Sequence, residues 1–385
     1  MRKRYFLDVD LKEKSFKVEE SDVQRKFIAT VDNFSMFANA YMPIEKLFTV
    51  NGRLFFQRIN GVFGEYVNGE IVEKGDFSNV SNIFAIGKGA TEKVALFTDE
   101  RCIDIDTGRI YNVPIGVIEN AFGRLFSASG NVIKISDDND LTDFSGGKYI
   151  KTNKQYGDVI DMRFFDEKLY VFTERAIYTL TEVNDLVGCK LEKLILPEIN
   201  IKRKSVQTVG DKIAFVSGNS ICTLKNDTLT FTTFTVEDKQ IYSSTVTDGE
   251  YVLKLDSDTV FYNFITDKIS VYDLGYFNIF GEYAVSPLEV GIYTFNRQNT
   301  GEKIVLKVDF DSAYKKTITE LSLYLETPIK LTVQGDFTKR VYFFNQGYNV
   351  KKLNLTSTDF SMQFDCEKAY SVKNLKIKYT TNGGD

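Results

Sequence analysis

A pair of turns recurs seven times along this chain, and the two turns of each pair lie about sixteen residues apart. The first turn of each pair leads into an apolar strand. From one repeat to the next, the middle residues of these first turns are 40, 31, 44, 44, 38 and 32 positions apart. A repeat of roughly 40 residues made of two consecutive hairpins is typical of a β-propeller blade. The middle residues of the first turns are Arg53, Lys93, Arg124, Lys168, Lys212, Glu250 and Glu282.

The first repeat shows the pattern most openly. Asn51-Gly52, Asn60-Gly61 and Asn68-Gly69 each predict a type I′ hairpin turn, so four antiparallel strands are expected. The fourth and fifth repeats follow the same pattern. The expected strands are 44–50, 54–58, 62–67 and 70–74 in the first repeat, 159–165, 169–173, 176–181 and 190–196 in the fourth, and 205–209, 212–216, 220–224 and 228–234 in the fifth.

The seventh repeat is weaker, because Val285-Ser286-Pro287 interrupts its second strand and proline cannot donate a ladder hydrogen bond. Six blades plus an extra hairpin is therefore an alternative to seven. After about residue 303 the two-hairpin period ends, and seven short strand candidates indicate a small β-sandwich. We expect an all-β chain with a six- or seven-bladed β-propeller at 41–302, followed by a C-terminal β-sandwich at 303–385.

Residues 1–40 precede the repeat and are predicted to form an N-terminal hairpin, with strands at 5–10 and 15–19, and an ordered arm. The N-terminus shows no apolar signal segment, and no apolar run is long enough to cross a bilayer. The cysteines at 102, 189, 222 and 366 are expected to be buried thiols rather than disulfides. We therefore expect a soluble protein made in a reducing cytoplasm, without a membrane anchor.

The composition bears directly on chemistry, because the chain contains no His. This excludes a serine triad with a histidine base and the commonest zinc ligand. We also find no phosphate loop, no dinucleotide-binding glycine motif and no paired-cysteine metal spacing. The net charge of −5 argues against tight binding to nucleic acid. The sequence therefore predicts no enzyme and no cofactor.

An acidic segment at 135–147 is the main candidate for a cation site, through Asp138, Asp140 and Asp143. The match to a calcium loop is poor, because no Gly follows at the bend and Tyr149 stands where a bidentate Glu would close the site. The same segment is similar to the Asp-box, a structural turn of sialidase-type propellers. The alternative is a solvated turn whose Asp side chains cap their own backbone.

Two charged segments are candidates for contacts between subunits. Glu174 and Arg175 form a turn between two central strands of the fourth repeat, and Lys202, Arg203 and Lys204 form a compact basic run after that repeat. An exposed turn and a solvated linker are the alternative interpretations, since exposed ion pairs contribute little.

Two segments resemble the propeller of tail proteins from short-tailed bacteriophages. They are VIKISD at 132–137 with LTDF at 141–144, and IDMRFF at 160–165 with YTL at 178–180. In that family, one element is a strand that ends in Ser-Asp and is followed by an acidic turn and an aromatic residue. The next element is a pair of strands joined by a turn that contains Thr-Glu. The family is the tail nozzle, also called tail tubular protein B or packed-DNA stabilisation protein, and the chain has no counterpart of its large inserted domains.

The resemblance implies a structural virion protein that forms a ring, a hexamer, around the DNA exit channel and helps retain and then release packed DNA. Its partners would be other copies of itself and adjacent tail or portal-adaptor proteins, with DNA passing through without specific binding. It would lie in the virion tail after assembly in the host bacterial cytoplasm. The alternatives are a propeller module that binds a receptor or glycan, and a propeller glycoside hydrolase with a carboxylate pair at the centre of the ring.

Overall fold

The chain forms two compact units in a computed structural model, and each is described by itself. The sandwich unit comprises residues 1–34, 269–275 and 296–385, and the propeller unit comprises residues 35–268 and 276–295. The residues described are 4–9, 21–28, 33–77, 79–86, 92–138, 140–183, 189–194, 197, 199–236, 239–256, 258–266, 268–297, 301–308, 315–366 and 372–381. Among them, no helix has the length and apolar character needed to span a membrane.

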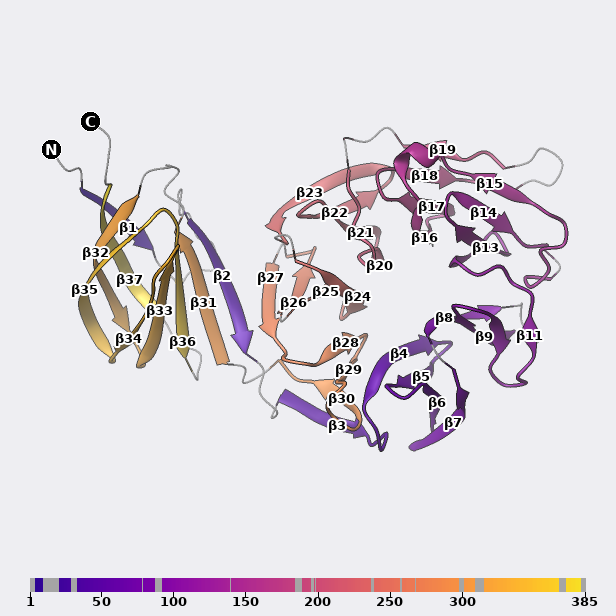
Figure 1. The fold of residues 1–385 in the computed structure, drawn as a ribbon, viewed down its shortest axis with the longest axis horizontal. Helices are drawn as coiled ribbons and strands as arrows, with labels where there is room; N and C mark the ends of the chain where they lie inside the picture. The colour runs from indigo at the N-terminus through magenta and orange to yellow at the C-terminus, as the bar shows by residue number, and fades with distance from the viewer. Residues whose placement is uncertain are drawn as a thin grey trace. The chain divides into compact units, whose positions relative to one another are not determined.

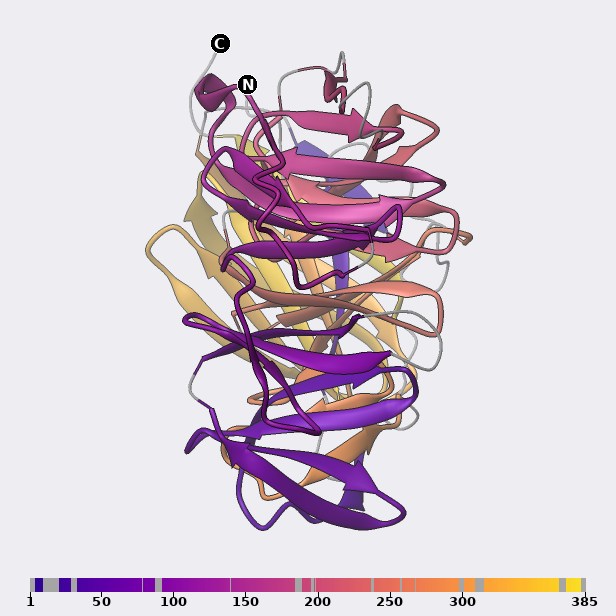
Figure 2. The ribbon, with the colours of Figure 1, turned by 90° about the vertical axis from the view of Figure 1, so that its right-hand side faces the viewer.

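The propeller unit is a ring of seven antiparallel blades, as Figure 1 shows. In the side view of Figure 2, successive blades stack on one another. The first three blades are formed by β4 (Ile44–Val50), β5 (Arg53–Arg58), β6 (Val62–Val67) and β7 (Glu70–Asp76), then β8 (Val80–Ile86), β9 (Lys93–Thr98), β10 (Cys102–Asp104) and β11 (Ile110–Tyr111), then β12 (Val117–Ala121), β13 (Arg124–Ser129), β14 (Val132–Ile135) and β15 (Tyr149–Lys151).

The next three blades continue this order, and a short 3-10 helix, η3, lies between the third and the fourth. The elements are η3 (Lys154–Tyr156), β16 (Val159–Phe165), β17 (Lys168–Thr173), β18 (Ile177–Leu180) and β19 (Glu192–Lys193), then β20 (Gln207–Val209), β21 (Lys212–Ser217), β22 (Ser220–Lys225) and β23 (Thr228–Thr235), then β24 (Ile241–Thr247), β25 (Glu250–Leu255) and β26 (Asp258–Asn263).

The seventh blade resolves the choice between six and seven blades. Its own segment supplies β28 (Asn278–Phe280), β29 (Tyr283–Val285) and β30 (Ile292–Phe295), and β29 ends before the interrupting Pro287. The fourth strand is β3 (Phe34–Ala38), which comes from the N-terminal side of the ring. The second turn of this repeat is predicted at 299–301, and residues 299 and 300 lie outside those that the structure describes. Gly301 begins β31, a strand of the sandwich unit.

Blade one matches the predicted strands closely. Asn51 and Gly52 have φ of 52° and 73°, and Asn68 and Gly69 have φ of 51° and 93°, as type I′ turns require. At the third dipeptide only Gly61 has a positive φ, so the type I′ prediction for Asn60-Gly61 is wrong. That turn is instead closed by the Gly61 amide donating to the carbonyl of Arg58 at 3.0 Å.

Both faces of the blades are buried, as the apolar strands predicted. On β17, Leu169 and Val171 pack toward blade three, whereas Tyr170 and Phe172 pack toward blade five. All four side chains are at most 2% exposed. The aromatic residues of this strand therefore form core rather than a binding surface.

The sandwich unit contains all seven strands expected at its C-terminal end, together with two strands from the N-terminus. β1 (Arg4–Val9) pairs with β37, and β2 (Ser21–Ile28) pairs with β31 and, in parallel, with β27 (Lys268–Asp273). The predicted N-terminal hairpin is thus not seen for β1, and its other strand, 15–19, lies outside the described residues. The remaining strands are β31 (Gly301–Val308), β32 (Lys316–Leu325), β33 (Ile329–Gly335), β34 (Lys339–Phe344), β35 (Gly347–Ser357), β36 (Phe360–Cys366) and β37 (Val372–Thr381).

Two sheets of the sandwich unit enclose an apolar core. One sheet has the order β1-β37-β32-β35, and the other contains β2-β31-β36-β33-β34. Leu323 of β32, Leu331 of β33 and Ile377 of β37 are fully buried between them. The predicted β-sandwich is therefore present, but it begins with the N-terminal strand β1 rather than at residue 303.

Candidate functional site

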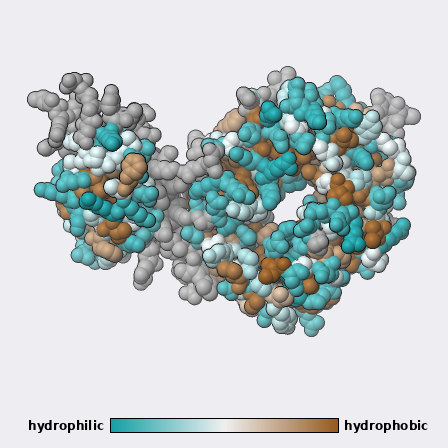
Figure 3. Space-filling model, viewed as in Figure 1, coloured by the Kyte–Doolittle hydropathy of each residue, from teal (hydrophilic) through white to brown (hydrophobic). Residues whose placement is uncertain are grey.

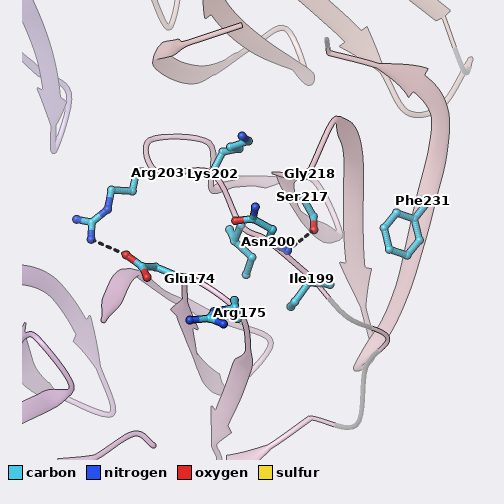
Figure 4. A pocket seen from close by; sticks show the side chains of 10 residues that line it. Glu174, Arg175, Ile199, Asn200, Lys202, Arg203, Ser217, Gly218 and Phe231 are labelled. Atoms are coloured by element: carbon cyan, nitrogen blue, oxygen red, sulfur yellow. Dashed lines mark hydrogen bonds and ion pairs between the residues drawn. The ribbon is translucent and has the colours of Figure 1, made fainter. Parts of the chain in front are cut away.

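An open cleft of about 790 Å³ lies at the junction of blades four and five, and we call it the blade 4–5 cleft. Figure 4 shows it with Arg203 extended toward Glu174. It gathers four of the five residues predicted as subunit contacts. Residues that matter to its chemistry are Glu174, Arg175, Asn200, Lys202, Arg203 and Phe231.

Backbone hydrogen bonds hold the cleft in shape. The linker between the two blades is fixed at Ile201, whose amide donates to the carbonyl of Glu174 at 2.8 Å, and at Lys202, whose amide donates to Val216 at 2.9 Å. The amide of Gly218 donates to the carbonyl of Asn200 at 2.7 Å. The basic run is therefore an ordered part of the wall and not a loose linker.

The side chains that line the cleft carry more positive than negative charges. Glu174 forms an ion pair with Arg203 at 3.2 Å, with the two side chains 43% and 62% exposed. Arg175 and Lys202 add two further cations. Lys204 follows directly in the sequence but is not among the residues that line the cleft. Phe231 contributes an aromatic side chain that is 46% exposed.

The three candidate cation ligands are engaged in turn hydrogen bonds and an ion pair. Asp140 Oδ1 accepts from the amide of Thr142 at 2.8 Å and from its hydroxyl at 2.6 Å, and Asp143 Oδ1 accepts from the amide of Ser145 at 2.8 Å. Asp138 faces Arg124 at 3.5 Å. No group of three acidic or Cys side chains suitable for a metal occurs among the described residues.

A partly buried cluster of charged residues on the inner strands was not predicted from the sequence. Figure 3 shows an open channel through the propeller unit with hydrophilic residues along much of its rim. On β16, Arg163 contacts Asp161 at 3.0 Å, and it lies 3.8 Å from Glu119 of β12 in the preceding blade. Its Nη2 also donates to the carbonyl of Val206, just before the inner strand of blade five, at 2.8 Å. The cluster therefore joins three consecutive blades.

The two carboxyl groups of this cluster have unusual proton affinities. Burial raises the pKa of Glu119 to about 7 and that of Asp161 to about 6, although Arg163 opposes both shifts. Single-sequence reasoning could not find the pair, because the chain has 53 acidic residues and nothing local distinguishes these two. The alternation on the inner strands is the only sequence signal that bears on them.

Two of the cysteines behave as predicted. Cys102 and Cys222 are buried thiols whose pKa values are raised by burial to about 12 and about 11. They are therefore protonated at neutral pH and do not form a reactive site.

Comparison with known proteins gave likeness in structure alone. No family model matches the chain, and no curated protein matches it in sequence. The extracellular domain of a hybrid two component system from B. thetaiotaomicron has 12% identity and a TM-score of 0.47, with 68% of this chain and 39% of that chain covered. BamB from Moraxella catarrhalis has 10% identity and a TM-score of 0.45, covering 72% and 98%.

A third similar structure is the WD40 beta propeller domain of Doa1, with 10% identity, a TM-score of 0.47 and coverage of 69% and 97%. The strand order of the two units defines the class of protein, a β-propeller with an attached β-sandwich. A fold of this kind does not by itself indicate a function.

Proposed function

We propose that this chain is a structural protein of a bacteriophage tail that forms a ring, the nozzle, around the DNA exit channel and helps to retain and then release packed DNA. The observation that carries the proposal is the blade 4–5 cleft. Its linker backbone is fixed by hydrogen bonds, while its charged side chains remain exposed. An ordered and accessible charged cleft suits a protein partner.

The charge distribution favours a second copy of the chain as that partner. The propeller unit holds 35 acidic and 26 basic residues, a net charge of −9, whereas the cleft offers three cations and one carboxylate. The acidic propeller surface of a neighbouring copy would complement the cleft. A contact between two different surfaces of identical chains is heterologous, and it generates a ring when the rotation closes.

The resemblance to nozzle proteins agrees with this use of the fold. Its two segments fall on β14 with the acidic turn, and on β16 to β18, which are strands of neighbouring blades. The resemblance implies six copies and contacts with adjacent tail or portal-adaptor proteins. An acidic propeller repels DNA phosphates, so DNA would pass without specific binding.

The test is negative-stain imaging of the purified full chain, alone and mixed with the neighbouring proteins of its particle. Rings support the proposal. Monomers in both preparations, across the concentrations accessible, would overturn it.

One observation favours a second candidate, a propeller glycoside hydrolase. Such enzymes use two carboxyl groups, one of them protonated near neutral pH, and Glu119 with its raised pKa meets the second condition. Against it, Arg163 contacts Asp161 and lies near Glu119, and each carboxylate side chain is only 15% exposed. Release of reducing sugar from a polysaccharide by the wild type, and its loss in Glu119→Gln, would support the hydrolase.

A further inference from the structure

A second cavity, of about 590 Å³, lies against the outer half of blade three, and we call it the blade 3 pocket. Its volume is within the usual range of small-ligand sites. The residues that define its chemistry are Asn112, Lys134, Phe144, Lys148, Tyr149 and Lys151.

Strand register places one face of blade three in this pocket. Lys134 of β14 is paired with Tyr149 of β15, and Val132 is paired with Lys151. Directly paired residues, and residues two positions apart, share one face of a sheet. The intervening Ile133 is fully buried on the opposite face, in the core with blade four. The two lysines and the tyrosine are therefore presented together by rigid strands.

The acidic segment at 135–147 forms the wall of the pocket. Leu141 and Phe144 anchor it in the apolar core between blades two and three. The amide of Asp137 donates to the carbonyl of Asp143 at 2.8 Å, and the amide of Ile135 donates to Lys148 at 3.0 Å. The segment therefore has a structural role. Its hydrogen bonds explain why turn-forming residues occur here, and a bound cation is not needed to explain them.

The pocket is positive within an acidic unit. Three lysines line it, and Asp143 is the single carboxylate, with one oxygen already accepting from Ser145. The ammonium of Lys151 lies 5.2 Å from the centre of the Tyr149 ring, and that ring is 58% exposed. A cation beside an accessible aromatic ring at a concave site suits a ligand that has both a flat apolar face and a negative charge.

We propose that the blade 3 pocket binds a saccharide that carries carboxylate groups, such as a uronic or sialic acid oligomer. The sugar ring would pack on Tyr149, and the lysines would form charge-assisted hydrogen bonds with the carboxylate. The amide of Asn112 can hydrogen-bond hydroxyl groups. A densely charged polymer such as DNA is disfavoured, because the surrounding unit carries a net charge of −9. This site goes beyond the assembly role and does not depend on it.

The test is isothermal titration of the purified full chain with four probes: oligogalacturonate, oligosialic acid, neutral maltohexaose and a single-stranded oligonucleotide. We expect at least one acidic probe to bind, and its affinity to fall as salt is raised. Lys134→Ala with Lys151→Ala should weaken that binding tenfold or more, and Tyr149→Ala should weaken it several-fold. Lys190→Ala is the matched control, because its side chain is 85% exposed and lies outside the pocket.

Thermal unfolding of each variant establishes that the variant is folded. If a variant does not fold, the single variant Lys134→Gln is measured in its place. Three results would overturn the proposal: no binding of either acidic probe, equal binding of maltohexaose, or binding that the pocket variants leave unchanged. Preferential binding of an oligonucleotide would overturn it as well. Ring formation by the same variants is read separately, so that loss of one function is distinguishable from loss of the other.

Discussion

The guanidinium of Arg53 makes two hydrogen bonds to the carboxylate of Asp106, at 2.8 and 2.9 Å, and so joins blade one to blade two. The same guanidinium makes two hydrogen bonds to Glu65, at 2.6 and 2.8 Å, and Lys74 lies 3.0 Å from Glu65. Hydrogen bonds from Arg53 lower the pKa values of both carboxyl groups. One arginine therefore holds two carboxylates across a blade junction.

The first prediction concerns this junction. Arg53→Ala should lower the free energy of unfolding by about 2–3 kcal/mol, because Glu65 is left with only Lys74 and its side chain is 6% exposed. Asp106→Asn should cost only about 0.5–1 kcal/mol, because Asp106 is 45% exposed and solvent screens the pair. Urea unfolding measures both. An equal effect of the two changes would contradict the account, and Lys225→Ala, from an exposed ion pair, should have almost no effect.

The second prediction concerns pH. The pKa of Glu119 is about 7 when folded against 4.5 ordinarily, so the folded state holds a proton that the unfolded state loses in this window. The contribution of Glu119 to the free energy of unfolding is fully present below pH 4.5 and is lost as the pH rises to about 7. Above that pH the contribution no longer changes. The loss of unfolding free energy is roughly 3 kcal/mol at most. The charged groups that face the Glu119 carboxyl are Asp161 and Arg163.

Glu119→Gln should remove this dependence. The measurement is the free energy of unfolding of wild type and variant at several values between pH 4.5 and 7.5. A difference between them that does not change with pH contradicts the prediction. Glu174→Gln, at an exposed carboxylate, is the control.

The third prediction tests how the ring closes. A Cβ on Gly291 would lie 2.8 Å from the carbonyl oxygen of Ala38 in β3. Gly291→Ala should therefore displace the closing strand and lower the melting temperature by several degrees. Gly249→Ala is the matched control, because Gly249 also has a positive φ but nothing lies within 4 Å of its Cβ position. Equal melting temperatures for the two variants would argue against β3 as a closing strand.

The fourth prediction concerns the acidic turn at 135–147. Asp140→Ala should lower the free energy of unfolding by about 0.5 kcal/mol, since it removes the acceptor for two hydrogen bonds from Thr142. Adding calcium should leave the melting temperature of the wild type unchanged. A calcium-dependent rise that Asp140→Ala abolishes would restore the cation site.

The strands of blades one and five could be predicted from the sequence because their turns are made by Asn, Gly and Asp at fixed spacing. Those of blade four could be predicted from the alternation of side chains along its apolar strands. The number of blades could not, because the fourth strand of blade seven is β3 and lies far from β30 in the sequence. Strand pairing over such a distance leaves no local signal. The place of β1 in the sandwich unit was missed for the same reason.

The blade 4–5 cleft could be predicted in part. The turn at Glu174 and the basic run at Lys202 stood out as charged segments, but their closeness depends on the hydrogen bond from Ile201 to Glu174. The blade 3 pocket could not be predicted from the sequence, because the acidic turn separates Lys134 from Lys148 and Lys151. The acidic residues of that turn indicated a cation site instead.

Sedimentation velocity of the full chain tests the central claim, assembly through the blade 4–5 cleft, most directly. Wild type should sediment as a closed oligomer, whereas Lys202→Glu with Arg203→Glu should sediment as a monomer with unchanged thermal stability. Lys190→Glu, a single charge reversal at an exposed lysine outside the cleft, should assemble as the wild type does. Assembly of the cleft variant to the same oligomer as the wild type would contradict the account.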